Sequence, residues 1–196
     1  MASKKAKTAV AVGGAAAIIA AVVPFVTRWE GTDRVAKRDM IGTGHPLTWC
    51  HGATSADDKA VRAGQRFTPA QCDTQLAKDL PKYLTPLQVC IHAVLPVKTM
   101  GALLDAAYNA GPTAVCKSPM VAHMNAGNLS AGCAAFTGWY VRASGRVVQG
   151  LINRRADEKK FCLAGVAEGL PKAAPTSKPH PWWQRLALLL TFRCPA

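Results

Sequence analysis

A long uncharged stretch near the N-terminus is the first feature of the hydrophobic pattern. No charged residue occurs from Thr8 to Val26. As a helix with ~1.5 Å rise per residue, this stretch would be roughly 28 Å long, close to the ~30 Å thickness of a bilayer core. Alanines, two glycines and Pro24 make it only weakly apolar, while three lysines precede it and Arg28 follows it. That charge order favours a cytoplasmic N-terminus. Residues 1–27 are therefore predicted to form an uncleaved, weak transmembrane signal-anchor, with a cleavable signal peptide as the alternative.

A helix with one apolar face is predicted to begin after residue 68. Thr68-Pro69-Ala70-Gln71 has the order of a capping box with proline at the first helical position. Leu76 and Leu80 continue an apolar stripe at helical spacing. Because proline disrupts a helix interior, this helix is predicted to end near Pro81.

The segment from Lys98 to Tyr108 predicts a central buried helix, because it is apolar on most sides. Gly111-Pro112 is a typical stop signal and ends it. Further helices are predicted over Pro119 to Met124, Ala131 to Ala143 and Val147 to Leu163.

Strand patterns are few outside the stretch from Asp39 to Thr54. The predicted fold class is therefore α+β, mainly α, with one domain over residues 28–169. After Gly169 the composition changes. Residues 170–181 contain four prolines and are predicted to be a linker. The tail that follows, PWWQRLALLLTFRCPA, is too short to span a bilayer but suits a membrane interface; docking back onto the domain is the alternative.

The cysteines indicate an oxidising compartment. The chain has seven, and none lies in the first forty-nine residues. Such use of cysteine is typical of disulfide-bonded exported proteins. An odd number leaves at least one thiol free or paired between chains, and Cys194 in the tail is the candidate. No C-x-x-C or H-E-x-x-H pattern occurs, so neither a metal site nor a cofactor is expected.

The net charge of +13 raises nucleic acid as a possible partner. No nucleic-acid motif accompanies the charge, and the basic residues are not interleaved with aromatics in one run. We therefore expect no nucleic acid partner. A basic surface would instead concentrate an exported protein on an anionic wall polymer, although solubility alone also accounts for it.

Two carboxylates form the candidate catalytic pair. Glu30 and Asp39 are nine positions apart, and the glycines and threonines around them suggest a helix end followed by a short hairpin. One protonated carboxyl can donate to a glycosidic oxygen while an ionised partner positions or activates water. Solvated or capping acids are the alternative.

Several motifs in order resemble one known family. Glu30-Gly31, Asp39, Gly42, Thr48, Cys50, Gly52 and Thr54 resemble the signature of glycoside hydrolase family 24, the phage endolysins or phage-type lysozymes. Tyr108-Asn109-Ala110-Gly111 is similar to the family's Y/F-N-x-G helix end, and 124–128 to its L-N-x-G-D turn. The segment from Gly150 to Cys162 is similar to its closing G-L-x-N-R-R-x-x-E segment.

The resemblance also has departures. The family pattern D-x-x-G-x-x-T is three residues longer here, because Thr43 to Leu47 separate Gly42 from Thr48. Where the family often has G-H-T, this chain has Gly52-Ala53-Thr54, with a histidine at His51. The hydrogen bonding beside the site must therefore differ from the usual pattern.

The resemblance implies a lysozyme-like fold with a small β-hairpin lobe and a larger helical lobe, and hydrolysis of peptidoglycan between N-acetylmuramic acid and N-acetylglucosamine. Glu30 would be the general acid, with Asp39 and Thr48 handling the water. Tyr108, Asn109 and Arg154 would bind or position substrate. A lytic transglycosylase and a non-catalytic wall-binding or membrane-anchored protein are the alternatives.

The implied location and partners follow from the same resemblance. Some of these endolysins are tethered to the host inner membrane by a weak signal-anchor and are later released into the periplasm. Peptidoglycan and that membrane are the expected partners, and the protein is expected to be a monomer.

Arg154 has two competing predictions. Its spacing from Glu158 predicts a solvent-exposed i,i+4 pair with little effect on function. The resemblance implies instead that Arg154 crosses between lobes to the Glu30 carboxylate.

Overall fold

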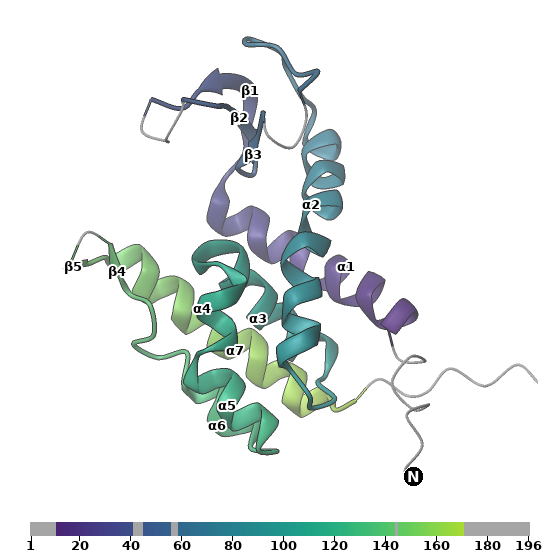
Figure 1. Ribbon diagram of the computed structural model, residues 1–196, viewed down its shortest axis with the longest axis vertical. Coiled ribbons are helices and arrows are strands. Elements are labelled where there is room, and N and C mark those ends of the chain that lie inside the picture. Colours follow the sequence, from purple (N-terminus) through teal and green to yellow (C-terminus); the bar gives the residue numbers. More distant parts are fainter. Residues whose placement is uncertain (1–10, 41–44, 56–58, 144, 171–196) are drawn as a thin grey trace, which may run out of the picture.

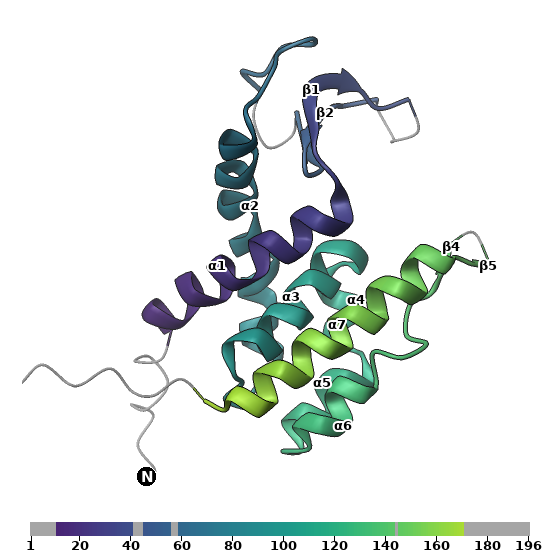
Figure 2. The ribbon, with the colours of Figure 1, turned by 180° about the vertical axis from the view of Figure 1, so that it is seen from behind.

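Two lobes with separate cores make up the protein in a computed structural model that describes residues 11–40, 45–55, 59–143 and 145–170. The small lobe holds a three-stranded sheet and the start of α2 (Pro69–Cys90) (Figure 1). The large lobe is helical, with α3 (Val97–Ala110) at its centre and α7 (Gln149–Glu168) packed beside it (Figure 2). The predicted α+β, mainly α, class with a small β lobe and a larger helical lobe is confirmed.

α1 (Ala11–Glu30) contains the described part of the predicted signal-anchor. Ile18, Val22 and Val26 recur at four-residue spacing and are buried in the large core, against α2 and α3. Within the described residues, no helix combines the length and apolarity needed to cross a membrane. Gly31, which follows α1, has φ +68°, a left-handed conformation that glycine adopts at low cost, and the chain turns there into the small lobe.

The small sheet has the order β1 (Asp33–Arg38), β2 (Leu47–Cys50), β3 (Ala53–Thr54), with antiparallel pairs throughout. Its first strand lies before Asp39 rather than after it, so the predicted hairpin began too late. Asp39 instead opens the β1–β2 connection, which its backbone N–H closes by donating to the Pro46 carbonyl at 2.8 Å. Gly42 and Thr43, part of the lengthened segment, lie outside the described residues.

α2 passes from one lobe into the other (Figure 1). The predicted capping box is present, with Thr68 and Gln71 exchanging both hydrogen bonds. The predicted end near Pro81 is wrong, because the helix continues to Cys90 through both Pro81 and Pro86. Leu76, Leu80, Leu84 and Leu87 are all buried, and this continuous stripe outweighs the backbone hydrogen bonds that the prolines lose.

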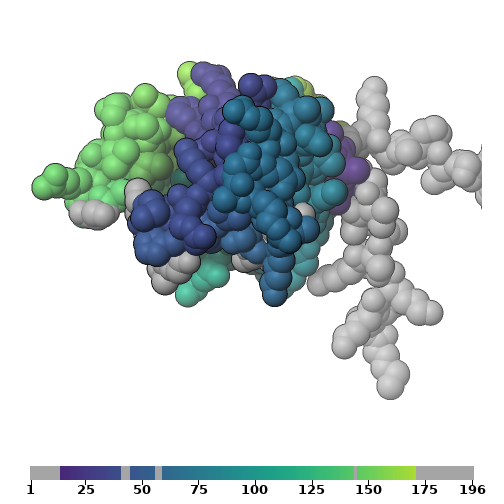
Figure 3. Space-filling view, turned by 90° about the horizontal axis from the view of Figure 1, so that it is seen from above, coloured from purple at the N-terminus to yellow at the C-terminus, as the bar shows by residue number. Residues whose placement is uncertain are grey.

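The predicted helix from Ala131 to Ala143 is largely wrong. α6 covers only Leu129–Ala134. Gly138 and Tyr140 then take positive φ values of 78° and 51°, which end helical geometry. A short hairpin follows, with β4 (Arg142–Ala143) paired to β5 (Arg146–Val147). Seen from above the small lobe, this end of the large lobe projects beside α1 (Figure 3).

The remaining predicted helices are present. α5 covers Pro119–Asn125, and α7 extends past the predicted end at Leu163 to Glu168. α4 (Pro112–Cys116) follows directly after the stop signal that ends α3 and was not predicted.

Three disulfides join the six cysteines of the described residues. They link Cys50 to Cys72, Cys90 to Cys116 and Cys133 to Cys162. Each closes a loop of moderate length and would stabilise the fold by about 2–4 kcal/mol. The predicted odd cysteine, Cys194, lies outside the described residues.

Candidate active site

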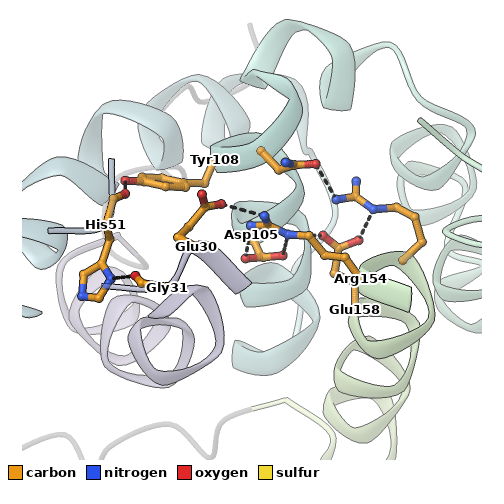
Figure 4. Close-up of polar contacts among 9 residues, drawn as sticks. Glu30, Gly31, His51, Asp105, Tyr108, Arg154 and Glu158 are labelled. Carbon is orange, nitrogen blue, oxygen red and sulfur yellow. Dashed lines mark hydrogen bonds and ion pairs between the residues drawn. The ribbon is translucent and has the colours of Figure 1, made fainter. Parts of the chain in front are cut away.

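Glu30 stands where the lobes meet, at the last residue of α1. Its carboxylate accepts a hydrogen bond from Arg154 Nη1 at 2.6 Å (Figure 4). The Glu30 side chain keeps 26% of its surface exposed whereas that of Arg154 keeps 5%. The carboxyl can therefore be reached from solvent while its partner is fixed inside the large lobe. The predicted contact across the lobes is present.

Asp105 holds the rest of the Arg154 guanidinium. It accepts from Nε at 2.9 Å and from Nη2 at 2.8 Å, a two-donor arrangement typical of strong arginine–carboxylate pairs. Asp105 lies on α3 and is fully buried. With two donors directed at Asp105, the third faces Glu30, so Asp105 sets the direction of the Arg154 side chain.

Burial alone lowers the pKa of Arg154. The hydrogen bonds and charge of Asp105, and then of Glu30, outweigh that effect and raise the pKa above its usual value. Arg154 is therefore a permanent cation whose charge is already matched by Asp105 before it meets Glu30.

Sequence reasoning missed Asp105. The signal was available: it is a charged residue in the middle of a helix predicted to be buried, and a buried carboxylate needs a partner. The spacing within α3 gave no means to identify Arg154, forty-nine positions away, as that partner.

The predicted surface pair between Arg154 and Glu158 is wrong. Glu158 is fully buried, and its carboxylate lies 3.8 Å from Arg154 Nε and 2.9 Å from Arg155 Nε. α7 turns this face toward α3, with which it packs extensively. The same helical spacing that suggested an exposed pair thus places both charges inside the lobe.

Glu158 has a pKa well above its usual range. Burial is the largest cause, and the hydrogen bond and negative charge of Asp105 add to it, against the opposing charges of Arg155 and Arg154. Arg155 has a lowered pKa, because burial outweighs the charge of Glu158. A proton held by Glu158 would leave this buried cluster with matched charges.

We expect the stability of the protein to reflect this proton. A native state that holds it more tightly than the unfolded chain gains stability below the unfolded pKa of about 4.3, and loses it as pH rises through the folded pKa. Glu158→Gln keeps a neutral side chain at every pH. The free energy of unfolding of this variant, relative to wild type, should therefore increase as the pH rises above about 4 in urea titrations.

Glu168→Gln is the matched control for that series, because Glu168 is an exposed acid paired with Lys98 on the surface. Its difference from wild type should change little with pH. If the Glu158 and Glu168 variants gave parallel curves, the buried carboxyl would be ionised over the whole range.

Asn109 and Tyr108 lie beside this cluster at the end of α3. Asn109 Oδ1 accepts from Arg155 Nη2 at 2.9 Å, and the Arg155 guanidinium also lies 5.3 Å from the centre of the Trp139 ring. The Tyr108 hydroxyl donates to the His51 carbonyl, and its ring lies 4.9 Å from that of Tyr83. Both predicted substrate-binding residues therefore also connect parts of the fold.

Asp39 and Thr48 lie on the small lobe. Thr48 is on β2, opposite Lys37 of β1, and its hydroxyl donates to the Lys37 carbonyl at 3.5 Å. The Asp39 carbonyl is 3.2 Å from His45 Nδ1 in the β1–β2 connection. Their catalytic roles stay predictions. No group of three or more metal-binding side chains gathers anywhere in the described residues.

Comparison with known proteins agrees with this geometry. The family model described as phage lysozyme matches residues 27–158. The SAR-endolysin of Enterobacteria phage P21 is 30% identical over 167 residues, covering 83% of this chain and 97% of that protein.

Two solved structures are also similar. An endolysin from Escherichia coli O157:H7 phage FAHEc1 has a TM-score of 0.60 at 26% identity, covering 85% of this chain and 99% of that one. The muramidase domain of SpmX from Asticaccaulis excentricus has a TM-score of 0.62 at 26% identity, covering 73% of this chain and 95% of that one. The matched region runs from the end of α1 through Glu158 and so contains Glu30, Asp105 and Arg154. The chain belongs to the phage lysozyme family.

Proposed function

We propose that this protein is an endolysin that hydrolyses the β-1,4 bonds between N-acetylmuramic acid and N-acetylglucosamine in peptidoglycan, for host cell lysis. The observation that carries the proposal is the Glu30 carboxyl, partly exposed at the junction of the lobes and held by Arg154. Family membership and the endolysin relatives support it.

Glu30 is the proposed general acid, which donates its proton to the glycosidic oxygen. An arginine beside a general acid would ordinarily oppose protonation of that acid. Here Asp105 takes two of the Arg154 donors and balances its charge. Arg154 can therefore orient the Glu30 carboxyl with much less electrostatic cost. Since all of these Arg154 donors face carboxylates, we assign it to positioning Glu30 and not to direct contact with the sugar.

Asp39 is the proposed residue that orients or activates the attacking water, with Thr48 helping to hold that water. Inversion of configuration is expected if the two carboxyls work about 6.5–9.5 Å apart. Tyr108 and Asn109 are proposed to line the sugar site at the end of α3. Because the Tyr108 hydroxyl is bonded to His51, its contact with a sugar would be made by the ring.

Product analysis tests the function. A hydrolase gives reducing ends from purified peptidoglycan, a lytic transglycosylase gives anhydro-sugar ends, and a wall-binding protein gives no product. Asp39→Asn separates the first two at the level of residues, because a transglycosylase needs one acid and no activated water. We expect reducing ends from wild type and at least a tenfold loss with Asp39→Asn, within the range for general acid–base groups. Anhydro-sugar ends would overturn the assignment.

The protein is proposed to act in the periplasm as a monomer. Before that, its N-terminal segment is proposed to tether it to the inner membrane. The names of the SAR-endolysin relatives support the tether. In the folded domain Val22 and Val26 are buried in the large core and α1 ends at Glu30. A lipid-embedded α1 would leave this part of the core empty and Glu30 away from Arg154. Release of α1 from the membrane is therefore proposed to activate the enzyme, because α1 can then enter the core and bring Glu30 to Arg154.

Substitutions on α1 test the tether. A Cβ placed on Gly14 meets no atom within 4 Å among the described residues, so Gly14→Leu should leave the folded domain intact. Leucine favours insertion by about 0.5 kcal/mol on the insertion scale, and replacing both Gly13 and Gly14 should roughly double the gain. We expect delayed lysis in timed culture turbidity, at equal exported amounts.

Ala17→Lys is the opposite variant. Ala17 is exposed in the folded domain, but a lysine in the membrane costs about 2.5–3.5 kcal/mol. This variant should be released early. Lysis on the wild-type schedule from both variants, with equal export, would show that the tether has no regulatory effect.

A further inference from the structure

His51 is a buried histidine outside the charged cluster. It contacts Gly31, the residue after Glu30, and Tyr108 at the end of α3. It lies in the tight turn between β2 and β3, with 2% of its surface exposed. Its ring Nδ1 is 2.6 Å from the Gly31 carbonyl oxygen, and its own carbonyl accepts from the Tyr108 hydroxyl. Figure 4 shows Glu30 between these contacts and the Arg154 cluster.

The chemistry of the contact to Gly31 fixes the position of one proton. A carbonyl oxygen only accepts, so at 2.6 Å His51 Nδ1 must carry the hydrogen. The other ring nitrogen, Nε2, is buried and lies 3.4 Å from Asp73 Oδ1, without a well-aligned hydrogen bond in the described structure. The bond to Gly31 is thus the strong contact of the ring.

The turn that carries His51 is held in place by contacts other than its bond to Gly31. Cys50 and Gly52, on either side, have positive φ values of 54° and 91°. Cys50 is also tied by its disulfide to Cys72 on α2. A Cβ on Gly52 would make an ordinary van der Waals contact with the Tyr108 hydroxyl at 3.7 Å, so the turn lies close to the end of α3. His51 therefore projects from a rigid part of the small lobe.

Gly31 is the residue directly after Glu30. Its backbone N–H still bonds to Thr27 in α1, while its φ of +68° turns the chain away from the helix axis. A bond to its carbonyl therefore sets the angle at which the last residue of α1 meets the site. Arg154 holds the carboxylate end of Glu30 from the large lobe.

We propose that His51 is a positioning residue for Glu30, acting through the Nδ1–H bond to the Gly31 carbonyl. His51 fixes the backbone of Glu30 from the small lobe, and Arg154 fixes its side chain from the large lobe. The position of the general acid then depends on both lobes. This inference rests on the proposed role of Glu30 as the acid.

Two substitutions of His51 test the contributions of its two ring nitrogens separately. In His51→Asn the amide stands where Nδ1 was and can still donate to Gly31. In His51→Gln the amide reaches toward the position of Nε2 and Asp73 and leaves Gly31 without a donor. Asp73→Asn is the matched control on the other side of the ring, because Asp73 is half exposed.

The readouts are kcat and KM on purified peptidoglycan, per folded molecule of the full chain. We expect His51→Gln to lower kcat about 10- to 100-fold with KM within about twofold, because a displacement near 1 Å costs up to that much. His51→Asn should keep kcat within about threefold, and Asp73→Asn should match wild type. Equal kcat in the Gln and Asn variants, per folded molecule, would overturn the proposal.

A measurement on wild type keeps the proposal testable if the Gln variant does not fold. The ¹⁵N NMR spectrum of histidine-labelled protein should show a protonated Nδ1 for His51. A neutral ring protonated only at Nε2 would rule out the bond to Gly31. Glu30→Gln in the same assay distinguishes the two levels of proposal: full activity there removes the assigned acid, whereas full activity of His51→Gln beside a dead Glu30→Gln removes only the role of His51.

Discussion

Glu30→Gln should reduce peptidoglycan hydrolysis by about 10²–10⁴-fold, because an amide cannot give the glycosidic oxygen a proton. The change conserves shape. Glutamine keeps an oxygen that can accept from Arg154 Nη1, and the side chain is partly exposed, so little desolvation cost changes. The variant should export and unfold as wild type does. Rates of reducing-end release, alongside thermal unfolding, make the comparison.

Glu168→Gln provides the same chemical change at an exposed acid on α7 and should be fully active. If Glu30→Gln retained lysis within tenfold of wild type while remaining folded, Glu30 would not be the acid.

Arg154→Ala should lower the free energy of unfolding by about 3–5 kcal/mol, because it leaves the buried charge of Asp105 without its partner. Glu158→Ala should lower it by about 1–3 kcal/mol, because it leaves a buried donor of Arg155 without its acceptor. For Glu158 this reverses the expectation of a small effect at a surface pair. Asp105 would lose both of its Arg154 donors, and Arg155 Nε would lose the Glu158 oxygen that lies 2.9 Å away. Urea unfolding near neutral pH measures both losses.

Activity should separate these two variants. Of these two residues, Arg154 is the one that contacts Glu30. At a temperature where both variants are folded, Arg154→Ala should therefore lose hydrolysis and Glu158→Ala should keep most of it. Arg154→Lys is a stricter variant. It restores the charge, but one ammonium cannot hold Asp105 with two parallel donors while pointing a third at Glu30. Wild-type activity in Arg154→Lys would show that charge alone suffices.

The sequence predicted local features well and pairings across the chain poorly. The capping box at Thr68 and the helix stop at Gly111-Pro112 each depend on a few adjacent residues, and both are present in the structure. The end of α2 was misjudged because the penalty at Pro81 is local, whereas its compensation comes from Leu84 and Leu87 entering a core built by other helices. Gly138, whose positive φ prevents a helix from continuing to Ala143, gave a local signal that the helical pattern around it obscured.

The candidate site divides in the same way. The contact between Glu30 and Arg154 was predicted from the resemblance to family motifs, and it is present at 2.6 Å. Asp105 and the burial of Glu158 depend on how α3 and α7 face each other. No spacing within either helix encodes that orientation, so an exposed pair and a buried cluster were equally compatible with the sequence.

The placement of the disulfides has a consequence for the order of assembly. All three lie beyond α1: one joins β2 to α2, one joins α2 to α4, and one joins α6 to α7. Within the described chain, no disulfide therefore requires a residue of α1 in order to form. A covalently finished body would then lack one noncovalent part, and adding it would bring Glu30 to Arg154. No disulfide of the described chain would therefore have to form or break when α1 joins the domain.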